Sequence, residues 1–222
     1  MRCLVLDTAL HACTAALATS DGDRAELVAG ESRPMRVGHA EALMPMVAPL
    51  LQDHALPDRI VTTVGPGSFT GLRVALSAAR GLALALRVPA FGVGTLAALA
   101  EDARMETHDR PVVAVLDARR DQVYVQAFAA EGAPLTAPAL VPLADAIARA
   151  RAAGAGAVLI GSGAELLAPH VDASAVLTPV SPSARALARL GARADAEASP
   201  PSPLYLRGPD AKMPFPSRLK AA

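Results

Sequence analysis

The chain has 222 residues, no net charge at pH 7 and a composition that is 52% hydrophobic but only 3% aromatic. This length is enough for one large domain or two lobes, each with its own core. The neutral charge argues against a protein that grips nucleic acid on its own, because such proteins carry a basic excess. Cys3 and Cys13 are too few for a disulfide framework. With no signal-peptide pattern and no uncharged apolar run of sufficient length, we expect a cytoplasmic protein without a membrane span.

The first hundred residues predict a mixed sheet with helices on its faces. Three short β-rich runs separated by turns are typical of an antiparallel meander. A helical pattern follows, and Pro45 and Pro49 inside it predict a kink or a late start. The expected order is strands over 2–8, 12–22 and 24–32, a helix over 37–54, a strand over 58–65, a long helix, a strand over 89–94 and a helix over 95–104.

A second, smaller α/β lobe is expected from residue 106 to 202, after a first lobe formed by 1–105. It is predicted to contain a hairpin that turns at 118–121, a helix over 142–154, a strand over 157–163 and a helix over 181–198. Ser181 or Ser183 is the expected N-cap of the last helix. The proline-rich tail, 203–222, is expected to be extended, partly disordered and packed back on the first lobe.

A glycine-rich loop, "GPGSFTGLR" at 65–73, joins a predicted strand to the long helix. It is not a Walker A loop, because no lysine follows Gly71. It is not a Rossmann fingerprint either, because the third glycine comes one place late. Two interpretations stay open. The backbone N–H groups, with Ser68, Thr70 and Arg73, can bind an anion, or the glycines form a tight turn and Ser68 or Thr70 caps the helix.

The long helix over 72–86 is apolar around most of its circumference. Its polar residues, Arg73, Ser77, Arg80 and Arg87, follow one stripe, and small residues fill much of the rest. Such a helix has to be covered on more than one side. The helix over 37–54 has the same character, so the two helices either cover each other or form a surface for a partner. The high apolar content favours the partner.

Five segments together resemble the TsaB (YeaZ) family: "LDT", "HAEALMP", "VGPGSFTGLRVALSAARGLA", "PAFGVGTLAALA" and "LYLR", in this order. The resemblance covers most of the first hundred residues and a piece of the tail. It implies a two-lobed α/β fold of the actin-like, Hsp70-like and sugar-kinase (ASKHA) class, with mixed sheets flanked by helices. It further implies a non-catalytic subunit required for threonylcarbamoyladenosine on tRNAs that read codons beginning with A. The implied partners are a TsaD-like catalytic subunit and a TsaE-like ATPase, with tRNA bound only through the complex.

The metal-binding histidines of the catalytic paralogue are missing at the matching positions of this sequence. The catalytic paralogue carries an H-x-x-x-H pair after the strand that matches "PAFGV", whereas Thr95 and Leu99 stand here. Two histidines one helical turn apart can share a metal ion, and leucine has no lone pair to give. His39 begins H-A-E-A-L, so H-E-x-x-H is absent too. We therefore expect no metal and no catalytic residue, which makes a metallopeptidase the weaker of two alternatives.

The other alternative is a stand-alone ATP-dependent kinase or ATPase of the same fold. In actin-like folds an aspartate after the first strand lies near the phosphates of ATP, and Asp7 holds this place. A second acidic residue in a phosphate loop of the other lobe is missing, and Asp117 is expected to be a turn residue. No cofactor is firmly implied by the resemblance, and ATP or ADP at the interface of the complex stays open. The candidate nucleotide or anion-binding residues are Asp7, Thr8, Gly65, Gly67, Ser68, Thr70, Gly71 and Arg73.

The partner surface is expected on the two apolar helices. Without its partner this surface is expected to self-associate into a homodimer. The candidate interface residues are His39, Leu43, Met44, Val47, Leu50, Leu51, Leu72, Ala75, Leu76, Ala79, Leu82 and Ala83.

Overall fold

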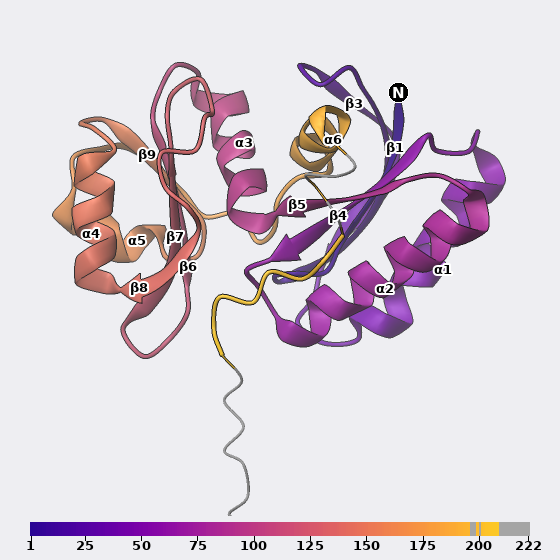
Figure 1. The fold of residues 1–222 in the computed structure, drawn as a ribbon, viewed down its shortest axis with the longest axis horizontal. Helices are drawn as coiled ribbons and strands as arrows, with labels where there is room; N and C mark the ends of the chain where they lie inside the picture. Colours follow the sequence, from indigo (N-terminus) through magenta and orange to yellow (C-terminus); the bar gives the residue numbers. More distant parts are fainter. Residues whose placement is uncertain (196–198, 200, 209–222) are drawn as a thin grey trace, which may run out of the picture.

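A computed structural model describes residues 1–195, 199 and 201–208 (Figure 1). It contains two five-stranded sheets, which lie next to each other in Figure 1 with helices on their faces. The first sheet has the order β3-β2-β1-β4-β5 and the second β10-β9-β6-β7-β8. The strands are β1 (Arg2–Asp7), β2 (Ala12–Ser20), β3 (Ala25–Pro34), β4 (Arg59–Gly65), β5 (Ala90–Gly94), β6 (Val112–Asp117), β7 (Gln122–Phe128), β8 (Ala139–Pro142), β9 (Ala157–Ile160) and β10 (Ala173–Leu177).

Both sheets repeat one topology. In each, the first strand in sequence pairs antiparallel with the second. The second strand pairs antiparallel with the third, which forms one edge of the sheet. On its other side the first strand pairs parallel with the fourth, which pairs parallel with the fifth. The predicted α/β class with two mixed sheets flanked by helices is therefore confirmed, as is the antiparallel meander at the N-terminus.

The helices cover the sheets in layers. Helices α1 (His39–Asp53) and α2 (Phe69–Leu86) pack on one face of the first sheet, and α3 (Thr95–Thr107) and α6 (Ala184–Arg193) pack on the other. Helix α3 also packs on the second sheet, so its buried residues join the cores of both lobes. The far face of the second sheet carries α4 (Leu143–Ala152) and α5 (Ala164–Leu167), and the 3₁₀ helix η1 (Ala168–His170) follows α5.

Helix α1 runs through both of its prolines. It begins at His39, so the late start predicted from Pro45 and Pro49 is wrong. Each proline removes one backbone hydrogen-bond donor. The helix continues from His39 to Asp53, and its buried face, which includes Leu43 and Val47, is part of the core of the first sheet.

Helix α6 corrects the predicted division into lobes. The sequence places the whole of 106–202 in the second lobe, but α6 contacts β1, β2, β3, β4 and β5 of the first sheet. Ser183 is its N-cap, with the hydroxyl oxygen accepting from the N–H of Ala186 at 3.1 Å. The predicted C-terminal end of this helix includes 196–198, which lie outside the described residues. Ser199 and Leu204 also lie on the first lobe, because the N–H of Gly92 donates to the carbonyl of Ser199 and the N–H of Leu204 to that of Val64.

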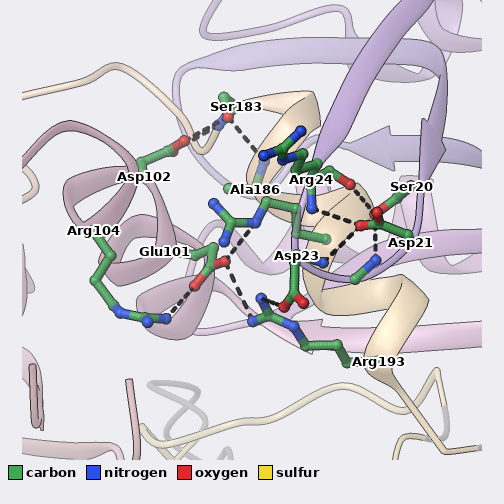
Figure 2. A network of polar contacts seen from close by, with 12 residues as sticks. Ser20, Asp21, Asp23, Arg24, Glu101, Asp102, Arg104, Ser183, Ala186 and Arg193 are labelled. Atoms are coloured by element: carbon green, nitrogen blue, oxygen red, sulfur yellow. Dashed lines mark hydrogen bonds and ion pairs between the residues drawn. The ribbon is translucent and has the colours of Figure 1, made fainter. Parts of the chain in front are cut away.

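A buried carboxylate ties α6 to α3 (Figure 2). The side chain of Glu101 is 3% exposed and forms ion pairs with three arginines. Its oxygens lie 2.8 Å from Arg104, 3.0 Å from Arg189 and 3.4 Å from Arg193. Next to it, Asp102 accepts hydrogen bonds from the N–H and hydroxyl of Ser183, so the start of α6 is also held by α3.

Four short elements were not predicted: β8, α5, η1 and β10. Each has five residues or fewer, which is too short to show a reliable period in the sequence.

Candidate functional site

The glycine loop packs directly on the end of β1. A Cβ atom on Gly67 would lie 2.5 Å from the carbonyl oxygen of Ala9, and one on Gly71 would collide with the carbonyl of Thr8. The N–H of Ser68 donates to the carbonyl of Ala9 at 2.7 Å. Glycine is thus required at two loop positions because two backbone segments touch. The Ser68 hydroxyl accepts from the N–H of Gly71 at 3.2 Å, which confirms the predicted cap of α2.

Asp7 and Thr8 are enclosed behind this loop. Both residues are fully buried. The Thr8 hydroxyl donates to the carbonyl of Gly71 at 2.6 Å. One carboxyl oxygen of Asp7 accepts from the Thr63 hydroxyl and from the N–H of Ala9, at 2.5 and 2.9 Å. The other finds no hydrogen-bond partner in the part of the chain that the structure describes.

The surroundings of Asp7 shield its carboxyl group from solvent. Burial raises the pKa of Asp7, while the Thr63 and Ala9 hydrogen bonds and the charge of His39 act in the opposite direction. His39 is itself buried at the start of α1, and its Nε2 atom likewise has no partner among the described residues. In this arrangement Thr8 bonds to the loop at Gly71, while Asp7 links the end of β1 to Thr63 of β4.

The candidate anion-binding residues therefore fall into two groups. Asp7, Thr8, Gly65 and Gly71 are buried, whereas Ser68, Thr70 and Arg73 are exposed and Gly67 is partly so. Nucleotide binding by this set stays a prediction. Thr95 is buried on α3, as is Leu99. Within the ranges that the structure describes, no group of three or more His, Cys, Asp or Glu side chains is arranged to hold a metal ion.

The cleft between the lobes has a volume of about 320 Å³ and brings the loop to the predicted polar turn. Gly67 and Ser68 line one wall, and Asp117, Arg119 and Ser162 line the other. Asp117 accepts from the N–H of Arg119 at 2.7 Å, while its own N–H donates to the Ser162 hydroxyl at 3.1 Å. Three successive turn residues, 119–121, have positive φ, a conformation that is costly outside glycine and clusters at functional sites.

Most of the predicted interface residues belong to the protein's own core. The structure corrects their placement, because a side chain buried against the sheet is not accessible to a partner. Met44 alone is clearly exposed, at 45%, and Leu51, Leu82 and Ala83 are partly buried. The buried ones are His39, Leu43, Val47, Leu50, Leu72, Ala75, Leu76 and Ala79.

The solvent side of α1 and α2 carries a partly different set of residues, which shares Leu43 and Met44 with the predicted interface. A groove of about 520 Å³ runs between the two helices. It is lined mainly by small and apolar side chains: Ala40, Leu43, Met44, Phe69, Thr70, Arg73, Val74, Ser77 and Ala78. Gly81 continues the same side of α2, and a Cβ atom there would meet nothing within 4 Å. Most of the residues predicted for the interface lie on the sheet-facing sides of these two helices, and a partner contact on either helix stays a prediction.

Helix α2 is also the one helix, within the described residues, that is long and apolar enough to cross a membrane by length and composition alone. Five of its residues are buried, in the cores beneath it. Arg73 and Arg80 lie on its exposed side. Its apolar character is therefore explained in part by packing within the chain.

Comparisons with known proteins agree on the family. Residues 35–159, more than half of the chain, match the family model of TsaD, tRNA N6-adenosine threonylcarbamoyltransferase. The tRNA threonylcarbamoyladenosine biosynthesis protein TsaB of Escherichia coli is 35% identical over 128 residues, 56% of this chain and 53% of that protein, so the match spans about half of the relative. An uncharacterized protein of Mycobacterium tuberculosis is 35% identical over 94% of this chain and 93% of its own length.

The solved structure of YeaZ from Pseudomonas aeruginosa extends this likeness to the whole fold. It superposes with a TM-score of 0.74 at 32% identity, covering 92% of this chain and 99% of that one. The chain described here therefore belongs to the TsaB (YeaZ) family.

Proposed function

We propose that this chain is a non-catalytic subunit that binds and activates a TsaD-like catalytic subunit in the synthesis of threonylcarbamoyladenosine on tRNA. The observation that carries the proposal is the open groove between α1 and α2, formed by an exposed methionine and small residues on two long helices. Small residues allow another helix to approach closely, and apolar surface left open to water is typical of an interaction site. A contact of ordinary size would bury about 1,200–2,000 Å² in all.

The burial of Asp7 supports the accessory role. A carboxylate that handled a phosphate-bound metal would need access to it, whereas Asp7 has no exposed surface and one of its oxygens is occupied by Thr63 and Ala9. The chemistry in this proposal belongs to the TsaD-like partner. A TsaE-like ATPase completes the complex, tRNA is bound through the whole assembly in the cytoplasm, and the isolated chain pairs with itself.

The contact can be tested without disturbing the fold. Met44→Glu and Gly81→Glu place a charge on the solvent side of α1 and α2, because the Met44 side chain is exposed and a Cβ atom at Gly81 would meet nothing within 4 Å. We expect each to weaken the complex with the TsaD-like protein roughly tenfold or more, as for a residue at the centre of an interface. Size-exclusion chromatography and titration calorimetry measure the complex, and modified nucleoside formed by the reconstituted subunits measures activation.

Ala148→Glu is the matched control, since Ala148 is exposed on α4 of the other lobe. The proposal is wrong if both groove variants bind the catalytic subunit as the unchanged chain does. It is also wrong if the isolated chain forms the modified nucleoside unaided. Changes at Leu76 or Ala79 would test the core instead, because both side chains are buried there.

A further inference from the structure

A second cavity gathers half of the protein's aromatic residues. The chain has two tyrosines, four phenylalanines and no tryptophan. Both tyrosines and Phe69 line a cavity of about 620 Å³, between the start of α2, strand β7 and the segment 204–208. In a chain with so few aromatic residues, three around one cavity are more than an ordinary part of its surface would carry. Its volume is typical of a site for a ligand of nucleotide size.

The rings are held in place but remain open to solvent. Phe69 and Tyr205 have ring centroids 5.3 Å apart, and they are 54% and 46% exposed. The guanidinium carbon of Arg73 lies 3.7 Å from the centre of the Phe69 ring, and its Nε donates to the Tyr205 hydroxyl at 3.3 Å. Exposed aromatic side chains fixed by their neighbours can stack with another flat ring at a small entropic cost.

The cavity is also positively charged. Arg73 and Arg207 line it, and none of its lining residues is acidic. Arg207 donates to the side-chain oxygen of Gln122 at 3.1 Å, a neutral partner. In the described part of the chain, neither arginine is in an ion pair. The N-terminus of α2, which meets the cavity at Phe69, adds partial positive charge.

We propose that this cavity binds an unpaired nucleotide of single-stranded RNA, with the base stacked on Phe69 and Tyr205 and the flanking phosphates on Arg73 and Arg207. Rings and cations together complement a base and its phosphate, whereas an acidic peptide would use the arginines and leave the rings without partners. The half-open rings suit a strand that passes across them rather than an enclosed small molecule. The inference rests on the proposed function, since it names the face of this subunit that meets tRNA.

The test is binding of a fluorescein-labelled single-stranded RNA of about ten nucleotides to the full chain, a length within the range that such sites bind. Fluorescence anisotropy gives the dissociation constant at several salt concentrations. We expect Tyr205→Ala to weaken binding roughly 5- to 100-fold, while Tyr205→Phe, which keeps the ring, binds as the unchanged chain does. Arg207→Ala should lower the slope of log K against log salt by about 0.7.

Leu84→Ala is the control, because Leu84 is an exposed apolar residue near the other end of α2. Thermal unfolding of each variant verifies its fold. The proposal is overturned if Tyr205→Ala binds RNA like the unchanged chain. It is equally overturned if polyglutamate displaces the RNA as well as unlabelled RNA does, or if AMP binds saturably where the RNA does not.

Phe69 and Arg73 line both this cavity and the groove proposed for the catalytic partner, so the two proposals are separated with Tyr205, which lines the cavity alone. Tyr205→Ala should assemble normally with the TsaD-like protein and bind RNA more weakly in the complex. If the unchanged chain fails to assemble, the proposed function fails while RNA binding by the isolated chain can still be measured. If assembly is normal and RNA binding is insensitive to Tyr205, only the RNA site is refuted.

Discussion

Replacing Glu101 by glutamine should destabilise the protein much more than the loss of one charge from an exposed ion pair would. Glutamine keeps the size of the side chain but leaves Arg104, Arg189 and Arg193 around a neutral group. Removing one partner of a fully buried ion pair costs about 3–5 kcal/mol. The arginine side chains here are 17–37% exposed, so solvent relieves part of this cost. We therefore expect a loss of about 2–3 kcal/mol in the free energy of unfolding.

Thermal unfolding followed by circular dichroism measures this loss. For a chain of this length, each kcal/mol lowers the midpoint by about 2–4 °C, so Glu101→Gln should unfold roughly 4–12 °C earlier. Glu31→Gln is the control, because Glu31 pairs with Arg33 on an exposed part of β3 and should leave the midpoint unchanged. Equal midpoints for the two variants would refute the view that the Glu101 cluster holds α6 on the first lobe.

Three other predictions concern a buried carboxyl group, two buried thiols and two glycines of α2. Burial raises the pKa of Asp102 to about 6. The stabilising contribution of its protonated form is therefore complete below the ordinary pKa of 3.8 and is lost as pH rises through about 6. Asp102→Asn should remove this part of the pH dependence of urea unfolding between pH 4 and 6. Burial raises the pKa of Cys3 and Cys13 to about 11, so both thiols should react with Ellman's reagent at pH 8 only when the protein unfolds. Gly81→Ala should stabilise the protein by about 0.5–1 kcal/mol, whereas Gly71→Ala, which collides with a backbone carbonyl, should destabilise it in the same denaturant titration.

Local patterns were enough to predict much of the first lobe. The short β-rich runs and turns of 2–32 predicted three strands, and Ser68 was one of the two residues considered as the cap of the long helix. The hairpin turn at 118–121 was predicted as well. These features depend on residues close together in sequence, so their signals lie within a short window.

Long-range contacts were not predictable in the same way. The pattern of α6 shows that it is an amphipathic helix, but not which sheet it covers. It packs on the first sheet through Leu187 and Ala188 and meets Glu101 of α3 through Arg193, across 92 positions of sequence. Nor does the sequence show that Asp7 lies behind the glycine loop, because its position after a strand suits either a phosphate site or a buried anchor.

The aromatic cavity was missed although the sequence held a signal. Tyr205 lies in "LYLR", a segment quoted for the family resemblance but given no role. Tyrosine occurs only twice in the chain, so a tyrosine in a proline-rich tail needs an explanation. What the sequence does not show is that this segment returns to the start of α2, where Tyr205 meets Phe69.

The two faces of α2 explain why the predicted interface fell on the core. Along one side, Leu72, Ala75, Leu76 and Ala79 recur at the helical period and are buried beneath the helix. A second side, on which Phe69, Val74 and Ala78 lie beside the polar Arg73 and Ser77, lines the groove shared with α1. Both sides carry apolar or small residues at the helical period, and the side that packs against the sheet becomes core. Because folding uses the first side, a change there lowers stability and complex formation together. Only changes on the groove side can show that the proposed contact is separate from the fold.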